Sequence, residues 1–456
     1  MTALFGWYDP SNFRTMTASF VFNVLLLLGT WDFIWRGEIL YSSESLSFSR
    51  VGYTDSSSTR ILLRSPNAEV VEVSWRNWET SPWISSVLTG ITAEEDFTAT
   101  ITIGDLVADT KYEYMTNASH RGSFQTLKSD QKVFTIISSS CIKPFFPYNP
   151  LDHPLRIIGL EHLSKYALRR SIDFMLFLGD FIYIDLPTNF GWTGDHYFKA
   201  YRQIYASPSW TAELFNLPFI HMYDDHEIIN DWASNETGLY KEAIQPFLAY
   251  HHHANPTTIR EGATHFVFSR GDVSFFVMDN RRYRSGLHVH ERERTMLGRE
   301  QLDDLQQWLR TEKRWKVLVS GVPFTRNWRN CSDEGDSWGG YLVERQSLLE
   351  TMWNTEGVII VSGDRHEHAT TIFPSPQGKN NVIEFSTSPL SQFYQPFERS
   401  YQQVEDTDVE IFSYSHGVSK FGVMTFNTTD PTSLTLEFDL IVNGVNIWQY
   451  NWRLNR

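Results

Sequence analysis

Residues 133–183 decide the fold. They read as a strand-like run, VFTIISSSC (133–141), and a second such run, DFMLFLGDFIY (173–183), with a stretch of helical spacing between them. In that stretch, residues 155–170, apolar side chains recur at positions such as Leu155, Ile158 and Leu163, the spacing of one helix face. Strand, helix and strand in this order predict an α/β architecture of packed layers.

The same rhythm continues towards the C-terminus. VSFFVMDN (273–280), WKVLVSG (315–321) and VIIVSGD (358–364) each end in a polar loop, and a helix over residues 300–310 is expected between the first two. Residues 421–453 alternate like strands, which predicts that the C-terminus closes the sheet. Because ligands of open α/β sheets gather at the carboxyl ends of strands, the polar loops are the expected site.

A segment of short strands precedes the α/β part. Five strand-like runs, separated by turn residues, follow one another between residues 60 and 126: RILLRS, EVVEVSW, FTATITI, KYEYMT and GSFQT. They predict a small antiparallel β-sandwich domain over residues 40–130, followed by the α/β domain over 131–456. We expect a structural role for the β-sandwich, which would shield or orient the second domain.

The N-terminus holds one long apolar segment. After a tail of residues 1–17, residues 18–35 (ASFVFNVLLLLGTWDFIW) are about long enough to span a bilayer, although Asn23 and Asp32 interrupt them. An uncleaved membrane anchor is the favoured interpretation. A cleaved signal peptide and a buried core helix are the alternatives. Basic residues flank the segment on both sides, so the orientation stays open.

Composition restricts the class of protein. Of the 456 residues, 41% are hydrophobic and 16 are Trp, which is typical of a folded chain and argues against disorder. The formal net charge of −15 argues against a nucleic-acid partner, because such proteins present a basic surface to phosphates. An acidic chain can still act on phosphate esters when bound cations reverse the local field.

Two further sets of residues bear on the compartment. Acceptor sequences for N-glycosylation occur at Asn117, Asn235, Asn330 and Asn427. They suit a membrane-anchored or secreted glycoprotein with a lumenal or extracellular body. The two cysteines, Cys141 and Cys331, allow one disulfide bridge, or one metal ligand and one bystander.

Four polar motifs follow predicted strands: Ser140-Cys141, Gly179 to Tyr183, Asp224 to Glu227, and Gly363 to His366. Each alone is weak, because a lone Gly-Asp is usually a turn and a lone buried Cys usually packs as a small hydrophobe. Together they supply carboxylates, imidazoles, a phenol and a thiol, which suit a transition metal beside a harder cation. Two ions bridged by an Asp can clamp a phosphate and activate water. By contrast, His251 to His253 lack the spacing of a metal site, and a solvated or helix-end cluster is expected there.

Eight motifs carry a family resemblance. Their order and spacing are similar to those of the corresponding motifs in the PhoD-like alkaline phosphatases. The motifs are SSSC, GDFIY, YDDHEIIND, MDNRRYRS, MLGREQLDDLQQWL, WKVLVSGVPF, DSWGGYLVERQ and SGDRHEHA. The chain resembles this family of the calcineurin-like metallophosphoesterase superfamily over nearly everything after residue 60. The resemblance implies a metallophosphoesterase-type fold, a layered β-sandwich flanked by helices. It also implies that the protein acts as a phosphodiesterase or phosphomonoesterase.

The resemblance also implies a site for Fe3+ and Ca2+. Cys141, Asp180 and Tyr183 would surround the iron, with Asp180 reaching towards the second ion. The remaining ligands that the resemblance implies are Asp225, Asn230, Asp364 and His366. Iron would remove the phenolic proton of Tyr183 near neutral pH despite its ordinary pKa near 10.

Two residues take catalytic roles in this comparison. His226 would protonate the leaving group, and the planar guanidinium of Arg281 suits two phosphate oxygens. The chain departs from the family pattern in two places. Family members commonly have Trp-Asp-Gly-Tyr where this chain has residues 338–341, so Gly339 replaces an aspartate. Asp231 stands where a second asparagine is common in the family. Both departures leave the substrate preference open.

The leading hypothesis is a hydrolase in which a metal-bound hydroxide attacks phosphorus in line, without a covalent enzyme intermediate. A membrane-proximal hydrolase of lipid-linked phosphates is one alternative, based on residues 18–35 and on the expected exposure of Trp192 and Trp210. A non-catalytic, metal-stabilised scaffold is another, although a structural metal would require neither His226 nor Arg281. A disulfide between the two cysteines would leave a metal site of oxygen and nitrogen ligands.

Overall fold

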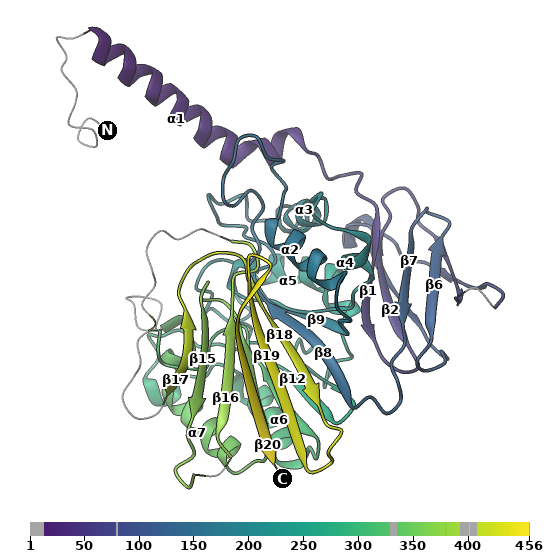
Figure 1. Ribbon diagram of the computed structural model, residues 1–456. Coiled ribbons are helices and arrows are strands. Elements are labelled where there is room, and N and C mark those ends of the chain that lie inside the picture. The colour runs from purple at the N-terminus through teal and green to yellow at the C-terminus, as the bar shows by residue number, and fades with distance from the viewer. Residues whose placement is uncertain are drawn as a thin grey trace.

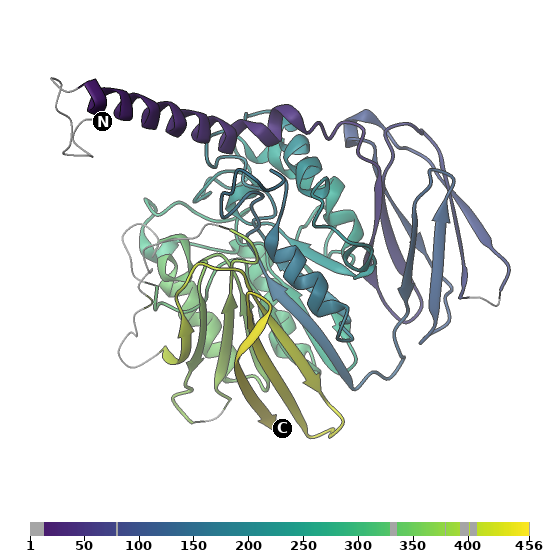
Figure 2. The ribbon, with the colours of Figure 1, turned by 45° about the horizontal axis from the view of Figure 1, so that its top comes forward.

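The computed structural model describes residues 13–78, 81–328, 335–378, 380–392, 401 and 408–455. A long helix, α1 (Phe13–Leu40), projects from a body that has a small β unit on one side and a large layered unit on the other (Figures 1 and 2). Cys331 and Asn330 lie outside the described residues, and with them the alternative of a Cys141–Cys331 disulfide and one glycan acceptor.

The small unit consists of two antiparallel sheets with strand orders β1-β2-β5 and β4-β3-β6-β7. Its strands are β1 (Phe48–Thr54), β2 (Thr59–Arg64), β3 (Val71–Asn77), β4 (Ile84–Leu88), β5 (Thr98–Ile103), β6 (Lys111–Thr116) and β7 (Arg121–Gln125). Alternate side chains such as Val51, Ile61 and Val73 share one core, as the period of two along a strand requires. The expected N-terminal antiparallel β region is confirmed.

The large unit consists of two facing sheets. The six-stranded sheet has the order β10-β9-β8-β18-β19-β20, and the seven-stranded sheet the order β11-β12-β13-β14-β16-β15-β17. The first contains β8 (Val133–Ser139), β9 (Phe174–Leu178), β10 (Phe219–Met222), β18 (Lys420–Asn427), β19 (Ser433–Val442) and β20 (Val445–Asn455). The second contains β11 (Phe266–Arg270), β12 (Val273–Val277), β13 (Trp315–Val319), β14 (Val358–Ser362), β15 (His368–Phe373), β16 (Val382–Thr387) and β17 (Val409–Tyr414). As predicted, the C-terminal strands complete a sheet, because β18 pairs with β8.

Helices cover the outer faces of both sheets. They are α2 (Ile158–Ala167), α3 (Gly194–Tyr205), α4 (Ala212–Asn216), α5 (Tyr240–Tyr250), α6 (Gly298–Thr311) and α7 (Leu342–Trp353). The first four share a core with the six-stranded sheet, α6 and α7 share one with the seven-stranded sheet, and a third core fills the space between the sheets. Central parallel strands such as β14 are buried along their whole length, which explains their continuous apolar runs. The predicted layered β-sandwich with flanking helices is confirmed.

Two local expectations were wrong. The helix expected over 155–170 is shorter, because Arg156 N donates to His153 O in a turn that precedes α2. Trp210 is only 9% exposed, because its ring stacks on Tyr205. The expected helix-end position of the histidine cluster is confirmed, because α5 ends at His251, although the side chain of His251 is fully buried.

Apolar side chains of α1 are exposed along its length. Phe20 is 70% exposed, and no part of the most apolar window is buried. The helix is therefore not a core helix of this body, and its length and composition suffice to cross a membrane. Asn117, Asn235 and Asn427 are exposed, as glycan acceptors must be.

Candidate metal centre

The polar motifs converge because each follows a strand whose carboxyl end lies at the same end of the two sheets. Cys141 follows β8, Asp180 follows β9, and Asp364 follows β14 of the facing sheet. Asp364 N donates to Ser140 Oγ at 3.0 Å, which joins the loops of the two sheets. A Cβ at Gly363 would lie 2.5 Å from the same Ser140 Oγ, so this close approach requires glycine.

The backbone at four expected ligands is left-handed. Cys141, Asp180, Asp364 and His366 have φ values of +64°, +58°, +75° and +59°. This region costs a non-glycine residue on the order of 1 to 3 kcal/mol and recurs at functional sites. Glu227 holds one of these turns, since its carboxylate accepts the Asp180 and Phe181 N–H groups at 2.9 and 2.6 Å.

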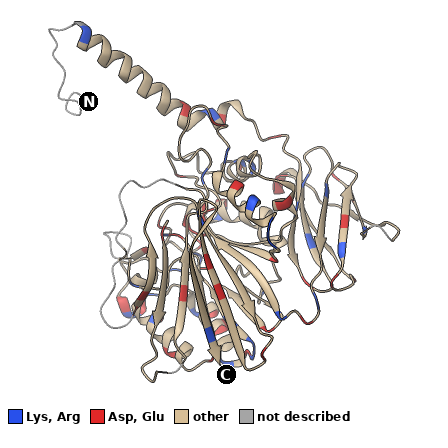
Figure 3. Ribbon diagram, in the orientation of Figure 1, with Lys and Arg blue, Asp and Glu red and all other residues tan. Residues whose placement is uncertain are grey.

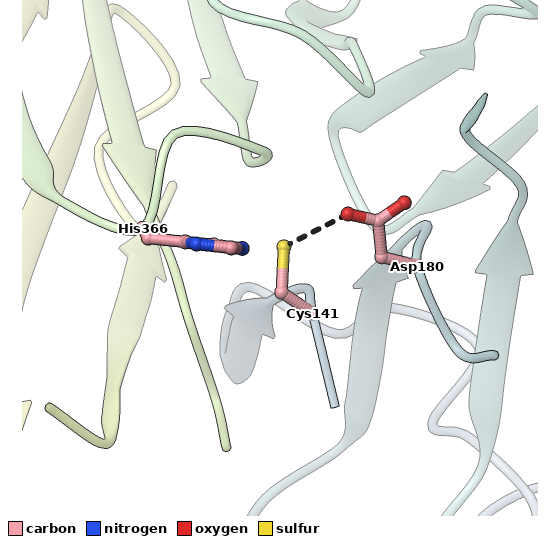
Figure 4. Close-up of side chains that lie close together, drawn as sticks. All are labelled: Cys141, Asp180 and His366. Carbon is pink, nitrogen blue, oxygen red and sulfur yellow. Dashed lines mark hydrogen bonds between the residues drawn. The ribbon is translucent and has the colours of Figure 1, made fainter. Parts of the chain in front are cut away.

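One group of donors meets at Asp180. Its Oδ2 lies 3.2 Å from Cys141 Sγ and 2.9 Å from the Tyr183 hydroxyl, which is 3.2 Å from His366 Nε2. Figure 4 shows the side chains of Cys141, Asp180 and His366 pointing towards one another. Burial, and then the carboxylates of Asp180 and Asp364, raise the pKa of the Cys141 thiol. Burial and the Asp180 carboxylate do the same to the pKa of Tyr183.

A second group shares Asp180. One oxygen each from Asp180, Asp224, Asp225 and Asp364 lies within 4.8 Å of the others. Asp180 Oδ1 and Asp224 Oδ2 are buried and accept no hydrogen bond from the described residues. Burial raises the pKa of Asp180. His226 opposes this shift, whereas the neighbouring carboxylates add to it. Buried carboxylates that repel one another ionise together only when cations compensate their charge, so these residues fit a metal site with two adjoining positions.

Arg281 lies behind this second group and is fully buried. Its guanidinium pairs with Asp224, lies 3.3 Å from Asp225 Oδ1, and makes a two-pronged contact with Asp336 at 2.6 and 3.1 Å. Although burial alone would raise the pKa of Asp336, Arg281 and Arg284 hold it well below its usual range. Arg281 is thus a partner of carboxylates in this structure, and its contact with phosphate stays a prediction.

His226 lies beside the first group. Its Nδ1 is 2.7 Å from Asp185 Oδ1, and its ring centroid is 4.2 Å from that of Tyr183. Burial alone would lower the pKa of His226, but the carboxylates of Asp225, Asp180 and Asp185 raise it to about 10. Asp185 Oδ2 also accepts the Asn230 N–H at 2.8 Å. Asn230 is exposed, and its role as a ligand stays a prediction.

Three acidic residues of the site had no assigned role in the sequence analysis. Asp224 stands in the quoted Asp-Asp-His-Glu motif, so a signal for it was present. Asp336 lies two residues before Trp338 and supplies a buried carboxylate near the position where the family's aspartate is missing. Asp185 follows Tyr183 by two residues, and no motif marks it. Asp231, the other departure, faces Asp225 and Asp336 within 4.8 Å.

Two facing sheets with side chains at their strand ends that could hold metal ions are the arrangement expected of a metallophosphoesterase. The model of the PhoD-like phosphatase family matches residues 159–435, and the chain belongs to this family. It is therefore a phosphoester hydrolase with a metal cofactor.

Solved structures agree in fold. The structure of PhoD aligns with a TM-score of 0.68 and 17% identity, over 89% of this chain and 88% of that one. Purple acid phosphatase PPD1 from yellow lupin (Lupinus luteus) seeds aligns with a TM-score of 0.64 and 13% identity, over 90% and 75%. Comparison with curated proteins gives no match.

Proposed function

We propose that the chain hydrolyses phosphate monoesters or diesters at a centre of Fe3+ and Ca2+. The observation that carries this proposal is the position of Asp180, whose Oδ2 meets the thiol and the phenol while Oδ1 is buried without a hydrogen-bond partner among the described residues. The proposed ligands are Cys141, Asp180, Tyr183, Asp225, Asn230, Asp364 and His366, with Asp224 added from the structure.

The donor types support two different ions. Thiolate, phenolate and imidazole donors suit ferric iron, and the carboxylate group suits the harder Ca2+. When bound, such ions supply Lewis acidity and lower the pKa of a water molecule, which can then attack phosphorus in line. Asp180 lies in both groups and would bridge the two positions.

His226 is the proposed general acid. Because Asp185 Oδ1 accepts from Nδ1, the proton for the leaving oxygen would come from Nε2. Asp185 is a positioning residue, because one of its oxygens contacts the His226 ring and the other accepts the Asn230 N–H. Arg281 neutralises Asp224 and Asp225, and its proposed second role is contact with phosphate oxygens.

Metal analysis and a visible spectrum of the purified full-length chain, compared with Tyr183→Phe, test the proposal. We expect iron and a broad tyrosinate-to-iron band that Tyr183→Phe abolishes. Tyr114→Phe, a buried tyrosine of the small β unit, is the matched control and should keep the band. Iron-free protein that becomes active with divalent ions alone would refute the iron assignment. Protein that binds metal but has no activity would favour the scaffold alternative, and protein with neither metal nor activity would refute the proposal.

We further propose that α1 anchors the chain in a membrane, with the body lumenal or extracellular. Exposure of its apolar side chains and of three glycan acceptors supports this placement. In this arrangement residues 40–130 form a structural domain, and residues 131–456 form the catalytic domain. The net charge of −15 supports a small or lipid-borne phosphate ester, rather than nucleic acid, as the substrate.

A further inference from the structure

A cavity lies where the end of α1 meets the catalytic body. Phe33, Ile34 and Gly37 of α1 line it on one side, and Lys143 and Tyr183 are among the residues on the other. About 80 Å³ is open inside. That space holds a phosphate group or a few methylenes but no whole lipid, given that a water molecule needs roughly 10 to 15 Å³.

The cavity adjoins the candidate metal centre through Tyr183. The hydroxyl of this tyrosine contacts Asp180 and His366, and the same residue is part of the cavity wall. A group that enters between α1 and the body therefore comes within one side chain of the proposed ligands.

The end of α1 is fixed to the body. Arg36 Nη1 donates to Pro150 O at 2.7 Å, the Tyr148 hydroxyl donates to Asp32 at 2.9 Å, and the Phe33 ring packs edge-on against Phe146. Figure 3 shows that the acidic and basic residues of α1 lie only near its two ends. Membrane insertion of the uncharged part would bring the fixed end, and with it the cavity, to the bilayer surface.

Exposed apolar side chains surround this junction. Trp31 and Trp35 of α1 are exposed, as is Tyr148 on the loop that binds Arg36. Leu151, in the same loop, is 93% exposed. Trp192 is also exposed, two residues beyond Phe190 of the cavity wall. Trp and Tyr at such a junction are typical of the membrane–water interface, and Leu151 would enter the apolar edge of the bilayer.

Two lysines, Lys143 and Lys199, line the cavity. Lys143 Nζ is 3.4 Å from the Tyr183 carbonyl oxygen and 5.2 Å from the Phe190 ring centroid. No carboxylate of the described residues lies within ion-pairing distance of it, whereas Lys199 of the same wall is paired with Glu38. Lys143 is thus placed to meet an anionic group that approaches Tyr183.

We infer that the substrate is a phosphate ester carried by a membrane lipid, whose headgroup enters this cavity past Lys143 while its acyl chains stay in the bilayer that holds α1. The inference rests on the proposed function and names its substrate class. In the reaction, a water oxygen bonds to phosphorus, the bond from phosphorus to the lipid alcohol oxygen breaks, and that oxygen takes a proton.

The test uses the full-length, metal-loaded chain reconstituted in phosphatidylcholine vesicles. Two matched pairs are compared: phosphatidic acid with glycerol 3-phosphate, and phosphatidylglycerol with glycerophosphoglycerol. Lys143→Gln is compared with Lys165→Gln, an exposed lysine of α2. Gly37→Leu, which would fill the cavity where a Cβ already comes within 3.3 Å of Leu155, is a second variant. Circular dichroism verifies that each variant folds.

We expect faster hydrolysis of the lipid member of at least one pair. Lys143→Gln should lower its kcat/KM by about tenfold, the size of one charge-assisted hydrogen bond, and Lys165→Gln should not. Equal rates on the lipid and its soluble counterpart, or a preference that survives both cavity variants, would overturn the inference and leave the phosphoesterase proposal standing. Inactivity on all four compounds and on nitrophenyl phosphates would overturn both.

Discussion

The Tyr183 hydroxyl lies 2.9 Å from Asp180 Oδ2, the oxygen that Cys141 Sγ also contacts at 3.2 Å. Only Phe181 and Ile182 separate the two partners in the sequence, and the left-handed backbone of Asp180 turns the chain between them. While protonated, the thiol and the phenol donate hydrogen bonds to this oxygen, but ionisation of all three groups would be an unfavourable arrangement. The arrangement becomes favourable when a cation is bound between them.

Asp180→Asn should therefore remove metal as well as activity. Replacing an outer partner of a metal ligand typically costs 10- to 100-fold in affinity or rate, so loss of a bridging ligand should cost more than about 100-fold in kcat/KM. Metal analysis and kinetics on a nitrophenyl ester measure both effects. Asp195→Asn, at an exposed position of α3, is the control and should change neither. Full metal content in Asp180→Asn would contradict the proposed bridge.

His226→Ala should affect esters according to their leaving groups. A general acid contributes about 10² to 10⁴ in rate when the departing oxygen needs a proton. Hydrolysis of an alkyl phosphate should thus fall by that factor, while a nitrophenyl ester, whose leaving group departs as an anion, should lose far less. Asp185→Asn should show a weaker form of the same pattern, since Asp185 holds His226 Nδ1. An equal loss on both esters would refute the acid role.

Sequence alone predicted most of the residues that converge at the candidate centre, because the strand-end motifs are local. Cys141, Asp180, Asp364 and His366 each follow a buried apolar run, and the sheets bring these ends together. Asp185 was missed because only the folded chain brings it to His226, 41 positions further on. Trp210 was misjudged for a related reason, since ring stacking across α3 and the following loop buries it.

Arg281→Ala should destabilise the metal-free protein by about 3 to 5 kcal/mol, because the variant leaves the buried Asp224 carboxylate without its ion-pair partner and leaves Asp336 paired with Arg284. Arg282→Ala is the matched control. Arg282 pairs with the exposed Glu236, so the loss should be about 1 kcal/mol or less. Denaturant unfolding in the presence of a chelator gives both values. Equal effects of the two substitutions would show that Arg281 does not stabilise the carboxylate group.

His221 and His251 predict how stability depends on pH. Their rings are fully buried and stacked with centroids 3.6 Å apart. Burial lowers the pKa of both histidines well below 6.5, and the positive charge of Arg50 lowers both further. The pKa of His221 is also lowered by repulsion from a charged His251. The unfolded chain therefore binds more protons than the folded one below about pH 6.5, and stability falls as the pH decreases.

Each of the two histidines should contribute a slope of up to about 1.4 kcal/mol per pH unit below that value. His221→Phe should remove one such contribution, because Phe fits among the neighbouring rings of Phe177 and Phe181 and cannot be protonated. Free energies of unfolding measured between about pH 6.5 and 5 give the slopes of wild type and variant. His416→Phe, at an exposed position, is the control. Parallel slopes for wild type and His221→Phe would show that His221 takes up its proton without unfolding.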